Sequence, residues 1–314
     1  MKSAFIFPGQ GSQRVGMGLE LAQVYEAAKE IFTQADRILG FSLSSIAWYG
    51  PEAELNDTFN TQPALFTHSI AALKVLQTHL PELAPVALAG HSMGEISAIT
   101  ASGALTFEQG LRLARTRGEL MKRAGELSPG GMVAILGLEI PLIEQICASV
   151  VSSIESLQVA NDNCPGQVVI SGSPPALERA IPILQQAGAR RIIKLAVSIA
   201  AHSSLMSHAQ FDFNRAVEET SLANPKIPIV GNVTAKPLST VLDIRRDLQD
   251  QLTNRVRWTE SVLELKSLGV THYYEIGAGS VLSGLVKRID PTATTISLGT
   301  PQEFANLLSI EDNR

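Results

Sequence analysis

Residues 88–98 read LAGHSMGEISA, which is an apolar run, a turn between two glycines and then a helical pattern. Gly90 and Gly94 let the chain turn sharply and let the helix pack closely on the strand, as in a nucleophile elbow. In such a turn Ser92 is exposed at the helix N-terminus, where free N–H groups favour negative charge. A small residue in a tight strand-to-helix turn gives the same pattern. The stretch therefore indicates an α/β fold and makes Ser92 a candidate nucleophile.

The flanking segments alternate between strand and helix patterns. An apolar strand is expected at 3–7 and another at 272–277, and helices are expected at 18–39, 61–80 and from Thr106 onward. This alternation favours a doubly wound, mainly parallel sheet.

The pattern changes after SPGG at 128–131. Strand, helix, strand, strand, helix and strand then follow within about 65 residues, which is the βαββαβ order of ferredoxin-like folds. We therefore predict an α/β-hydrolase-like core formed by residues 1–128 and 198–314. Residues 129–197 are predicted to form an inserted ferredoxin-like subdomain.

The bulk composition restricts the functions open to the chain. Its 314 residues carry a formal net charge of -5, which argues against a broad nucleic-acid surface. Cys147 and Cys164 provide neither a disulfide framework nor the spacing of a zinc site. No apolar run is long enough to span a bilayer or to serve as a signal peptide. We expect a cytoplasmic protein that binds no metal and inserts into no membrane.

A serine nucleophile needs a base, and the chain contains six histidines. His91 adjoins Ser92, and its side chain is expected to point away from it. His202 lies where the subdomain returns to the core, and a junction between domains often holds a cleft. A structural role beside the Ser203 helix start is also compatible with this position. His202 is therefore the candidate base.

The loop FPGQGSQ at 7–13 is a candidate oxyanion hole. It follows the first predicted strand, and its two glycines let backbone amides approach a ligand closely. The second N–H of such a hole normally comes from the residue after the nucleophile, here Met93. An ordinary glycine-rich turn fits the spacing equally well. The loop lacks the Gly-Lys-Ser/Thr of a P-loop.

With these pieces assembled, the sequence closely resembles the malonyl-CoA:acyl-carrier-protein transacylases of fatty-acid synthesis and the related polyketide acyltransferases. The resemblance covers nearly the whole chain, from FPGQGSQ to GLVKRI. Its seven markers are FPGQGSQ at 7–13, TQPA at 61–64, GHSMGE at 90–95, Arg117-Gly118 with Met121, the stretch from Asn161 through NCPGQVVISG, His202, and Gln251 ahead of Val256-Arg257-Trp258.

The resemblance implies roles for individual residues. Ser92 is the acylated nucleophile, His202 is its general base, and the main-chain carbonyl of Gln251 orients the histidine. The backbone N–H groups of Gln10 and Met93 form the oxyanion hole.

The resemblance also implies how the substrate is recognised. Arg117 binds the carboxylate of the malonyl group, which a planar guanidinium can hold through two parallel hydrogen bonds. An acyl chain without a carboxylate leaves the buried arginine unpaired and is rejected. Asn161 is a further candidate for substrate contact.

The implied activity is that of an [acyl-carrier-protein] S-malonyltransferase that works by a ping-pong mechanism. Its partners are malonyl-CoA and an acyl carrier protein, and the coenzyme A thioester is a substrate, so no cofactor is expected. Carrier proteins of this kind are acidic, so some local basic residues are expected to face one. The local basic cluster consists of Arg112, Arg115, Arg117, Lys122 and Arg123, and a solvated helix face gives the same pattern.

Two departures from the family pattern keep other donors and reactions open. Met93 replaces the usual leucine, and Ala200 and Ala201 precede His202 where relatives commonly carry a larger residue. Small side chains there widen the predicted acyl pocket, so methylmalonyl or broader acyl donors stay open. The alternatives are a trans-acting acyltransferase of a polyketide synthase with broader specificity, a serine acyl hydrolase, or a subunit that only docks a carrier protein.

Overall fold

The structure is a computed structural model in which residues 2–197 and 199–311 are described. Its main sheet has six strands in the order β10-β9-β1-β2-β7-β8, and all neighbouring pairs are parallel except β7 with β8. The strands are β1 (Ser3–Phe7), β2 (Ala87–Gly90), β7 (Ile229–Val230), β8 (Pro237–Leu238), β9 (His272–Ile276) and β10 (Thr294–Leu298). A parallel sheet is buried on both faces, and β1 and β2 are accordingly buried along their whole length.

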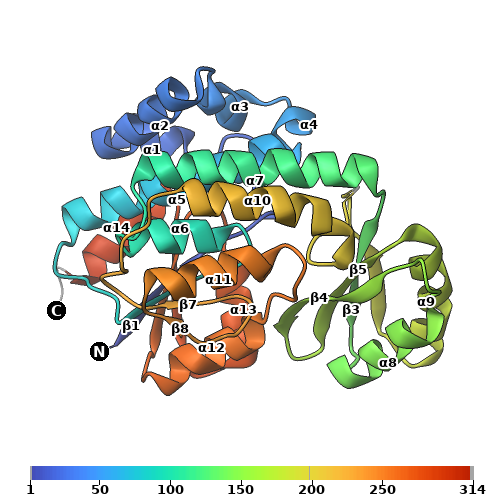
Figure 1. Cartoon of the computed structure of the whole chain (residues 1–314). Coiled ribbons are helices and arrows are strands. Elements are labelled where there is room, and N and C mark those ends of the chain that lie inside the picture. The colour runs from blue at the N-terminus through green and yellow to red at the C-terminus, as the bar shows by residue number, and fades with distance from the viewer. Residues whose placement is uncertain (1, 198, 312–314) are drawn as a thin grey trace.

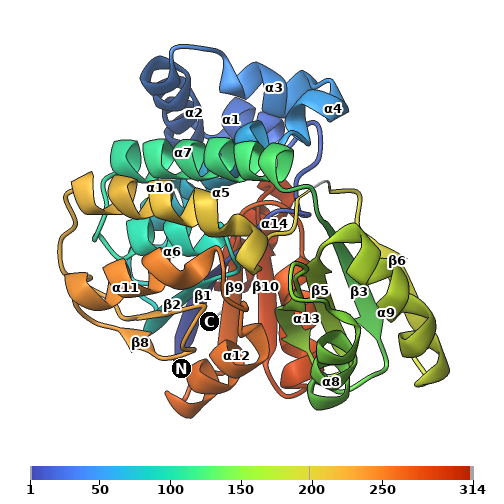
Figure 2. The same ribbon diagram turned by 45° about the vertical axis from the view of Figure 1, so that its right-hand side comes forward.

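Helices cover both faces of this sheet (Figures 1 and 2). Phe5 and Phe7 of β1 point into a core shared with α5, α6 and α7, whereas Ala4 and Ile6 point into a second core shared with α12 and α13. The core helices are α1 (Leu19–Val24), α2 (Glu26–Leu39), α3 (Leu43–Tyr49), α4 (Glu52–Leu55), α5 (Thr58–His79), α6 (Gly94–Ala101), α7 (Phe107–Leu127), α10 (Ser207–Glu219), α11 (Val241–Gln251), α12 (Trp258–Ser267), α13 (Val281–Ile289) and α14 (Pro301–Glu311).

A second, antiparallel sheet lies to one side of the main one (Figure 1). Its strands are β3 (Gly131–Leu136), β4 (Leu157–Cys164), β5 (Gln167–Gly172) and β6 (Arg191–Lys194), and they pair in the order β4-β5-β3-β6. Helices α8 (Ile140–Val150) and α9 (Pro174–Gln186) pack on it and share an apolar core with it. The βαββαβ order with β3 and β5 central is the ferredoxin-like arrangement.

The two sheets are joined through β4. The Asp162 N–H donates to the Val256 carbonyl (2.9 Å), and the Val256 N–H donates to the Ala160 carbonyl (2.9 Å). The Thr259 hydroxyl adds a hydrogen bond to the Asp162 carboxylate (2.6 Å). These bonds hold β4 against the start of α12, so the antiparallel sheet is attached to the helical layer on one face of the main sheet.

The predicted fold class is confirmed, while several elements differ from the sequence-based expectation. The helix expected at 18–39 is two helices, because Tyr25 adopts an extended backbone between them. Helices α3, α4, α11 and α14 and strands β8 and β10 were not predicted. In α11 the buried face carries Asp247 and Gln251 as well as Ile244 and Leu248, so apolar residues mark only half of that face. No helix in 2–197 or 199–311 is long and apolar enough to cross a membrane.

Candidate active site

The turn between β2 and α6 lifts Ser92 out of the sheet. Ser92 has φ 53°, in the left-handed region, at the point where the strand gives way to the helix. A Cβ at Gly90 would collide with the backbone of Gly94, and a Cβ at Gly94 would collide with the carbonyl of Phe7. Both glycines are therefore required by close backbone contact, and the elbow predicted from GHSMGE is present.

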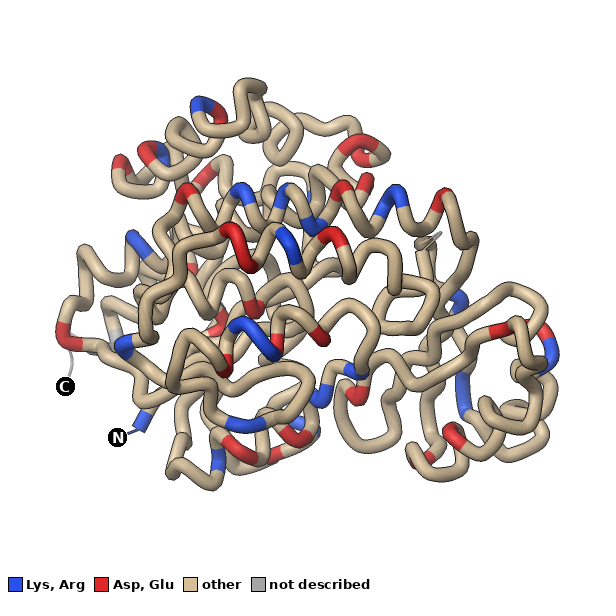
Figure 3. The backbone as a smooth tube through the Cα atoms, viewed as in Figure 1, with Lys and Arg blue, Asp and Glu red and all other residues tan. Residues whose placement is uncertain are grey.

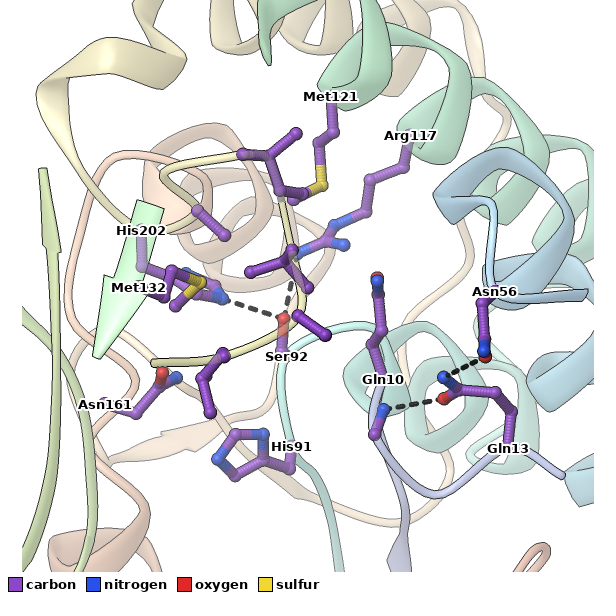
Figure 4. Close-up of a pocket in the computed structure, with 16 residues that line it drawn as sticks. Gln10, Gln13, Asn56, His91, Ser92, Arg117, Met121, Met132, Asn161 and His202 are labelled. Carbon is purple, nitrogen blue, oxygen red and sulfur yellow. Dashed lines mark hydrogen bonds between the residues drawn. The ribbon is translucent and has the colours of Figure 1, made fainter. Parts of the chain in front are cut away.

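His202 lies beside the serine. Its Nε2 is 2.8 Å from Ser92 Oγ (Figure 4). Its Nδ1 is 2.9 Å from the main-chain carbonyl of Gln251. Because a carbonyl only accepts, Nδ1 carries the proton, which leaves Nε2 free to accept from the serine hydroxyl. Burial, reinforced by the positive charge of Arg117, lowers the pKa of His202 to about 3. The imidazole is therefore neutral at neutral pH and can act as a base.

Two backbone amides flank the serine. Neither the Gln10 N–H nor the Met93 N–H donates a hydrogen bond within the described residues. A Cβ at Gly9 would collide with the carbonyl of His91, so this glycine lets the Gln10 loop lie against the elbow. Free N–H groups at this position can stabilise the oxyanion of a tetrahedral intermediate.

Arg117 reaches the serine from α7. Its side chain is 1% exposed, and Nη2 donates to Ser92 Oγ (3.1 Å) and to Gln251 Oε1 (2.8 Å). Nη1 donates to Gln62 Oε1 (2.9 Å), while the buried Nε has no partner. Burial lowers the pKa of Arg117 to about 10, so it remains charged at neutral pH.

The glycine of the Arg117-Gly118 marker explains how α7 comes this close. A Cβ at Gly118 would lie 2.7 Å from the Thr58 carbonyl and 2.8 Å from Phe59 Cα, at the start of α5. Only glycine permits this approach without displacement, and it brings Arg117 within reach of Gln62 on α5. No role was assigned from the sequence to Gln62 or to Asn232. The Asn232 Oδ1 accepts a hydrogen bond from the Ser92 N–H (2.7 Å).

Ser92, His202 and Arg117 open into a cavity of about 320 Å³ (Figure 4). Asn161, Met132 and Ala201 also line it. The predicted acyl-pocket residue Ala200 does not line it: Ala200 is fully buried, and its Cβ fills the space beside Gly130. Of the two alanines, only Ala201 can therefore affect the width of the cavity directly.

His91 also lines the cavity, although its ring does not contact the serine hydroxyl. Its Nε2 is 2.8 Å from Asn163 Oδ1, and the ring packs at a tilt on Trp258, with 5.6 Å between centroids. Burial lowers the pKa of His91. The His91 side chain therefore points away from the Ser92 hydroxyl, as expected, but it still forms part of the cavity wall.

The basic residues of α7 do not form one continuous patch. Arg117 is buried, Arg115 packs over the rings of Phe41 and Phe59, and Lys122 pairs with Asp57 (2.5 Å). Figure 3 shows basic and acidic residues interspersed along α7 and α10.

The geometry can support acyl transfer through a serine. A neutral histidine can accept the serine proton, the N–H groups of Gln10 and Met93 have no partner within the described residues, and a buried cation stands 3.1 Å from the nucleophile. A cation there suits an acyl group that carries its own negative charge. Among residues 2–197 and 199–311, no group of three or more histidine, cysteine or acidic side chains is arranged to hold a metal ion.

Known proteins with the same sequence pattern and fold are acyltransferases. Residues 4–291 match the acyl transferase domain family. The chain is 41% identical to the malonyl CoA-acyl carrier protein transacylase of Bacillus subtilis (strain 168) over 96% of this chain and 94% of that one. It is 40% identical to the transacylase of the same name from Escherichia coli O157:H7, over 98% and 99% of the two chains.

Solved structures of malonyltransferases have the same fold as this chain. The crystal structure of an acyl carrier protein S-malonyltransferase from Vibrio cholerae superposes with a TM-score of 0.93 at 39% identity, covering 98% of this chain and 100% of that one. A malonyl-transacylase in complex with a type II PKS acyl-carrier protein superposes with a TM-score of 0.93 at 38% identity, covering 99% and 100%. The chain therefore belongs to the acyl transferase family that includes the malonyl CoA-acyl carrier protein transacylases.

Proposed function

We propose that the chain transfers a malonyl group from malonyl-CoA to the phosphopantetheine thiol of an acyl carrier protein, for fatty-acid biosynthesis. The names of its relatives support this activity. The observation that carries the choice of acyl group is the buried Arg117 guanidinium, 3.1 Å from Ser92 Oγ. A buried cation beside the nucleophile favours an acyl group that ends in a carboxylate, since a plain acyl chain leaves the charge unpaired.

The first half-reaction acylates the serine. His202 Nε2 takes the proton from Ser92 Oγ as the oxygen attacks the thioester carbonyl carbon. The N–H groups of Gln10 and Met93 stabilise the resulting oxyanion. The intermediate then collapses, the C–S bond breaks, and coenzyme A leaves as a thiol with the proton returned from His202. The malonyl carboxylate replaces Ser92 Oγ as the partner of Arg117.

The second half-reaction runs the same steps with a different thiol. The phosphopantetheine thiol gives its proton to His202 and attacks the malonyl-Ser92 ester carbon. The same two amides hold the oxyanion. Ser92 Oγ then leaves with the proton from His202, which restores the free enzyme. Each step uses one base and one oxyanion site, so the proposal requires no cofactor beyond the thioester substrate.

Mass spectrometry of the intact protein mixed with malonyl-CoA, in the presence of EDTA, tests this proposal. We expect one malonyl adduct that maps to Ser92, forms despite the chelator, and disappears when a holo acyl carrier protein is added. Ser92→Ala is expected to give no adduct. Absence of an adduct in the wild-type protein would overturn the proposal, and rapid loss of the adduct to water without carrier would indicate the acyl hydrolase.

The pathway and the cellular compartment belong to the same proposal. One structural relative is in complex with a type II PKS carrier, so that carrier class is the second acceptor to test. Faster unloading of malonyl-Ser92 by a fatty-acid carrier than by a polyketide carrier is the expected result. The expected cytoplasmic location stays a prediction, which cell fractionation can check.

A further inference from the structure

Two buried carboxyl groups lie behind the nucleophile and take no part in the transfer chemistry described above. Glu95, on the first turn of α6, is 0% exposed, and Asp247, on α11, is 3% exposed. A single N–H, that of Asn232, lies between them, 2.8 Å from Glu95 Oε1 and 3.1 Å from Asp247 Oδ2. In the described part of the chain neither carboxyl forms an ion pair with lysine or arginine.

Glu95 connects two side-chain amides that serve the site. Its Oε1 accepts from Asn232 Nδ2 (3.0 Å), and its Oε2 accepts from Gln251 Nε2. When a carboxyl oxygen accepts from the nitrogen of a side-chain amide, the oxygen of that amide points away from the carboxyl group. Main-chain carbonyls add to this, since Asn232 Nδ2 also donates to Gly90 (2.7 Å) and Gln251 Nε2 to Ser92 (3.1 Å). The Asn232 oxygen therefore faces the Ser92 N–H (2.7 Å), and the Gln251 oxygen faces Arg117 Nη2 (2.8 Å).

The orientation of Gln251 matters most for Arg117. If the Gln251 amide turned over, its NH₂ group would face the guanidinium, which has only donors. The contact that now holds Arg117 Nη2 would become repulsive, and the guanidinium would move away from the serine.

We propose that Glu95, protonated and sharing its proton with Asp247, is the positioning residue that sets the orientation of Gln251 and Asn232 and thereby places Arg117 for a carboxylate-bearing acyl group. Two buried carboxyls that accept from the same Asn232 N–H and have no cation paired with them among the described residues keep one proton between them, and burial raises the pKa of both. Burial and the neighbouring Asp247 charge raise the pKa of Glu95 well above its usual value. The inference rests on the proposed function for its activity readout alone.

The activity test compares two donors in single-turnover acylation of Ser92. In Glu95→Gln the new NH₂ group faces an amide donor. Asn232 is held independently by the Gly90 carbonyl (2.7 Å) and the Ser92 N–H (2.7 Å), so we expect Gln251 to turn over and to give up its longer bond to the Ser92 carbonyl (3.1 Å). We expect acylation by malonyl-CoA to fall on the order of 10²-fold, as for a misplacement of about 1 Å, and the malonyl-to-acetyl ratio to fall at least about tenfold. An unchanged ratio, with both donors slowed alike, would overturn the positioning role.

The matched control is Glu275→Gln. Glu275 is also 0% exposed, but it accepts from the N–H groups of Leu282 (3.0 Å) and Ser283 (2.6 Å) at the start of α13. This variant is expected to lose stability while keeping the malonyl-to-acetyl ratio. Should Glu95→Gln not fold, Glu95→Asp serves instead. The aspartate keeps the carboxyl group but is too short to reach the amides of both Gln251 and Asn232. Its malonyl-to-acetyl ratio is therefore expected to fall as well.

A second readout does not depend on the activity at all. In wild-type protein labelled with ¹³C at the glutamate carboxyls, NMR at neutral pH is expected to show a protonated carboxyl that persists in Glu275→Gln. The same signal is expected to vanish in Asp247→Asn. The substitution replaces the negative charge beside Glu95 with a neutral amide donor, which lowers the pKa of Glu95 and favours its ionised form. Absence of the signal in the wild type would overturn the shared proton. A wild-type protein with the signal but without acyl transfer would instead refute the proposed function.

Discussion

Replacing Arg117 by glutamine is the most direct probe of acyl selectivity. The guanidinium is 1% exposed and is held by Gln62 and Gln251 with one side toward Ser92 Oγ. In the malonyl-enzyme we expect the acyl carboxylate to occupy this buried region beside the serine. Without the arginine, that carboxylate is buried with no cation to pair with, whereas an acetyl group loses no interaction.

The magnitude follows from the burial. Removing one partner of a buried ion pair costs about 3–5 kcal/mol, which is roughly 10²- to 10⁴-fold in rate. We expect kcat/KM for malonyl-CoA to fall by that factor in Arg117→Gln. For acetyl-CoA we expect a change below about tenfold, because the transition state gains nothing from a cation that has no carboxylate to bind. Arg117→Lys keeps the charge but loses the planar fork. Its kcat/KM for malonyl-CoA is therefore expected to lie between that of the wild type and that of Arg117→Gln.

The assay is stopped-flow release of coenzyme A with each donor at matched concentrations. Arg112→Gln is the control, because Arg112 lies on the same helix, is half exposed and pairs with Glu108. It is expected to leave both donors within about twofold. An equal fall for malonyl-CoA and acetyl-CoA in Arg117→Gln would refute the carboxylate assignment and point to a general role in positioning the serine.

Two further predictions concern pH and backbone packing. Burial lowers the pKa of His202 to about 3 and that of His68 to about 4, so only the unfolded chain takes up protons at these positions as the pH falls below about 6.5. The free energy of unfolding, measured in urea, should therefore decrease from pH 6.5 toward 4, whereas kcat/KM should show no inflection from His202 near pH 6.5. Separately, Gly94→Ala should lower kcat about 10²-fold or more, because its Cβ pushes α6 away from the Gln10 loop and widens the oxyanion hole. Gly284→Ala, where a Cβ meets nothing within 4 Å, is the control, and normal kcat in Gly94→Ala would contradict the close-packing argument.

Short stretches of sequence predict the local structure of the site. GHSMGE specifies the elbow because glycines are the only residues that fit two close backbone contacts, at Gly90 and Gly94. The pattern of FPGQGSQ similarly marks a loop whose amides can approach a ligand. These features depend on neighbours within a few residues, so they can be read without knowing the fold.

The polar support of the site was harder to predict. Helix α11 was missed because Asp247 and Gln251 occupy its buried face and interrupt the apolar pattern. Asn232 follows the short strand β7 and meets Ser92 only because β7 pairs with β2. Gln62 stands within a recognisable motif, but nothing in its spacing shows that it holds Arg117.

The sequence by itself determined the α/β class, the elbow at Ser92 and His202 as the candidate base, and its resemblance to a known family implied the role of Arg117. Only the tertiary structure decided that the side chains of Gln62 and Gln251 hold Arg117, how Glu95 joins the amides of Gln251 and Asn232, and that Ala201 rather than Ala200 faces the cavity. The physical reason is that strand and helix patterns depend on contacts within a few residues. The hydrogen bonds of the site join residues up to 159 positions apart, and no local pattern records them.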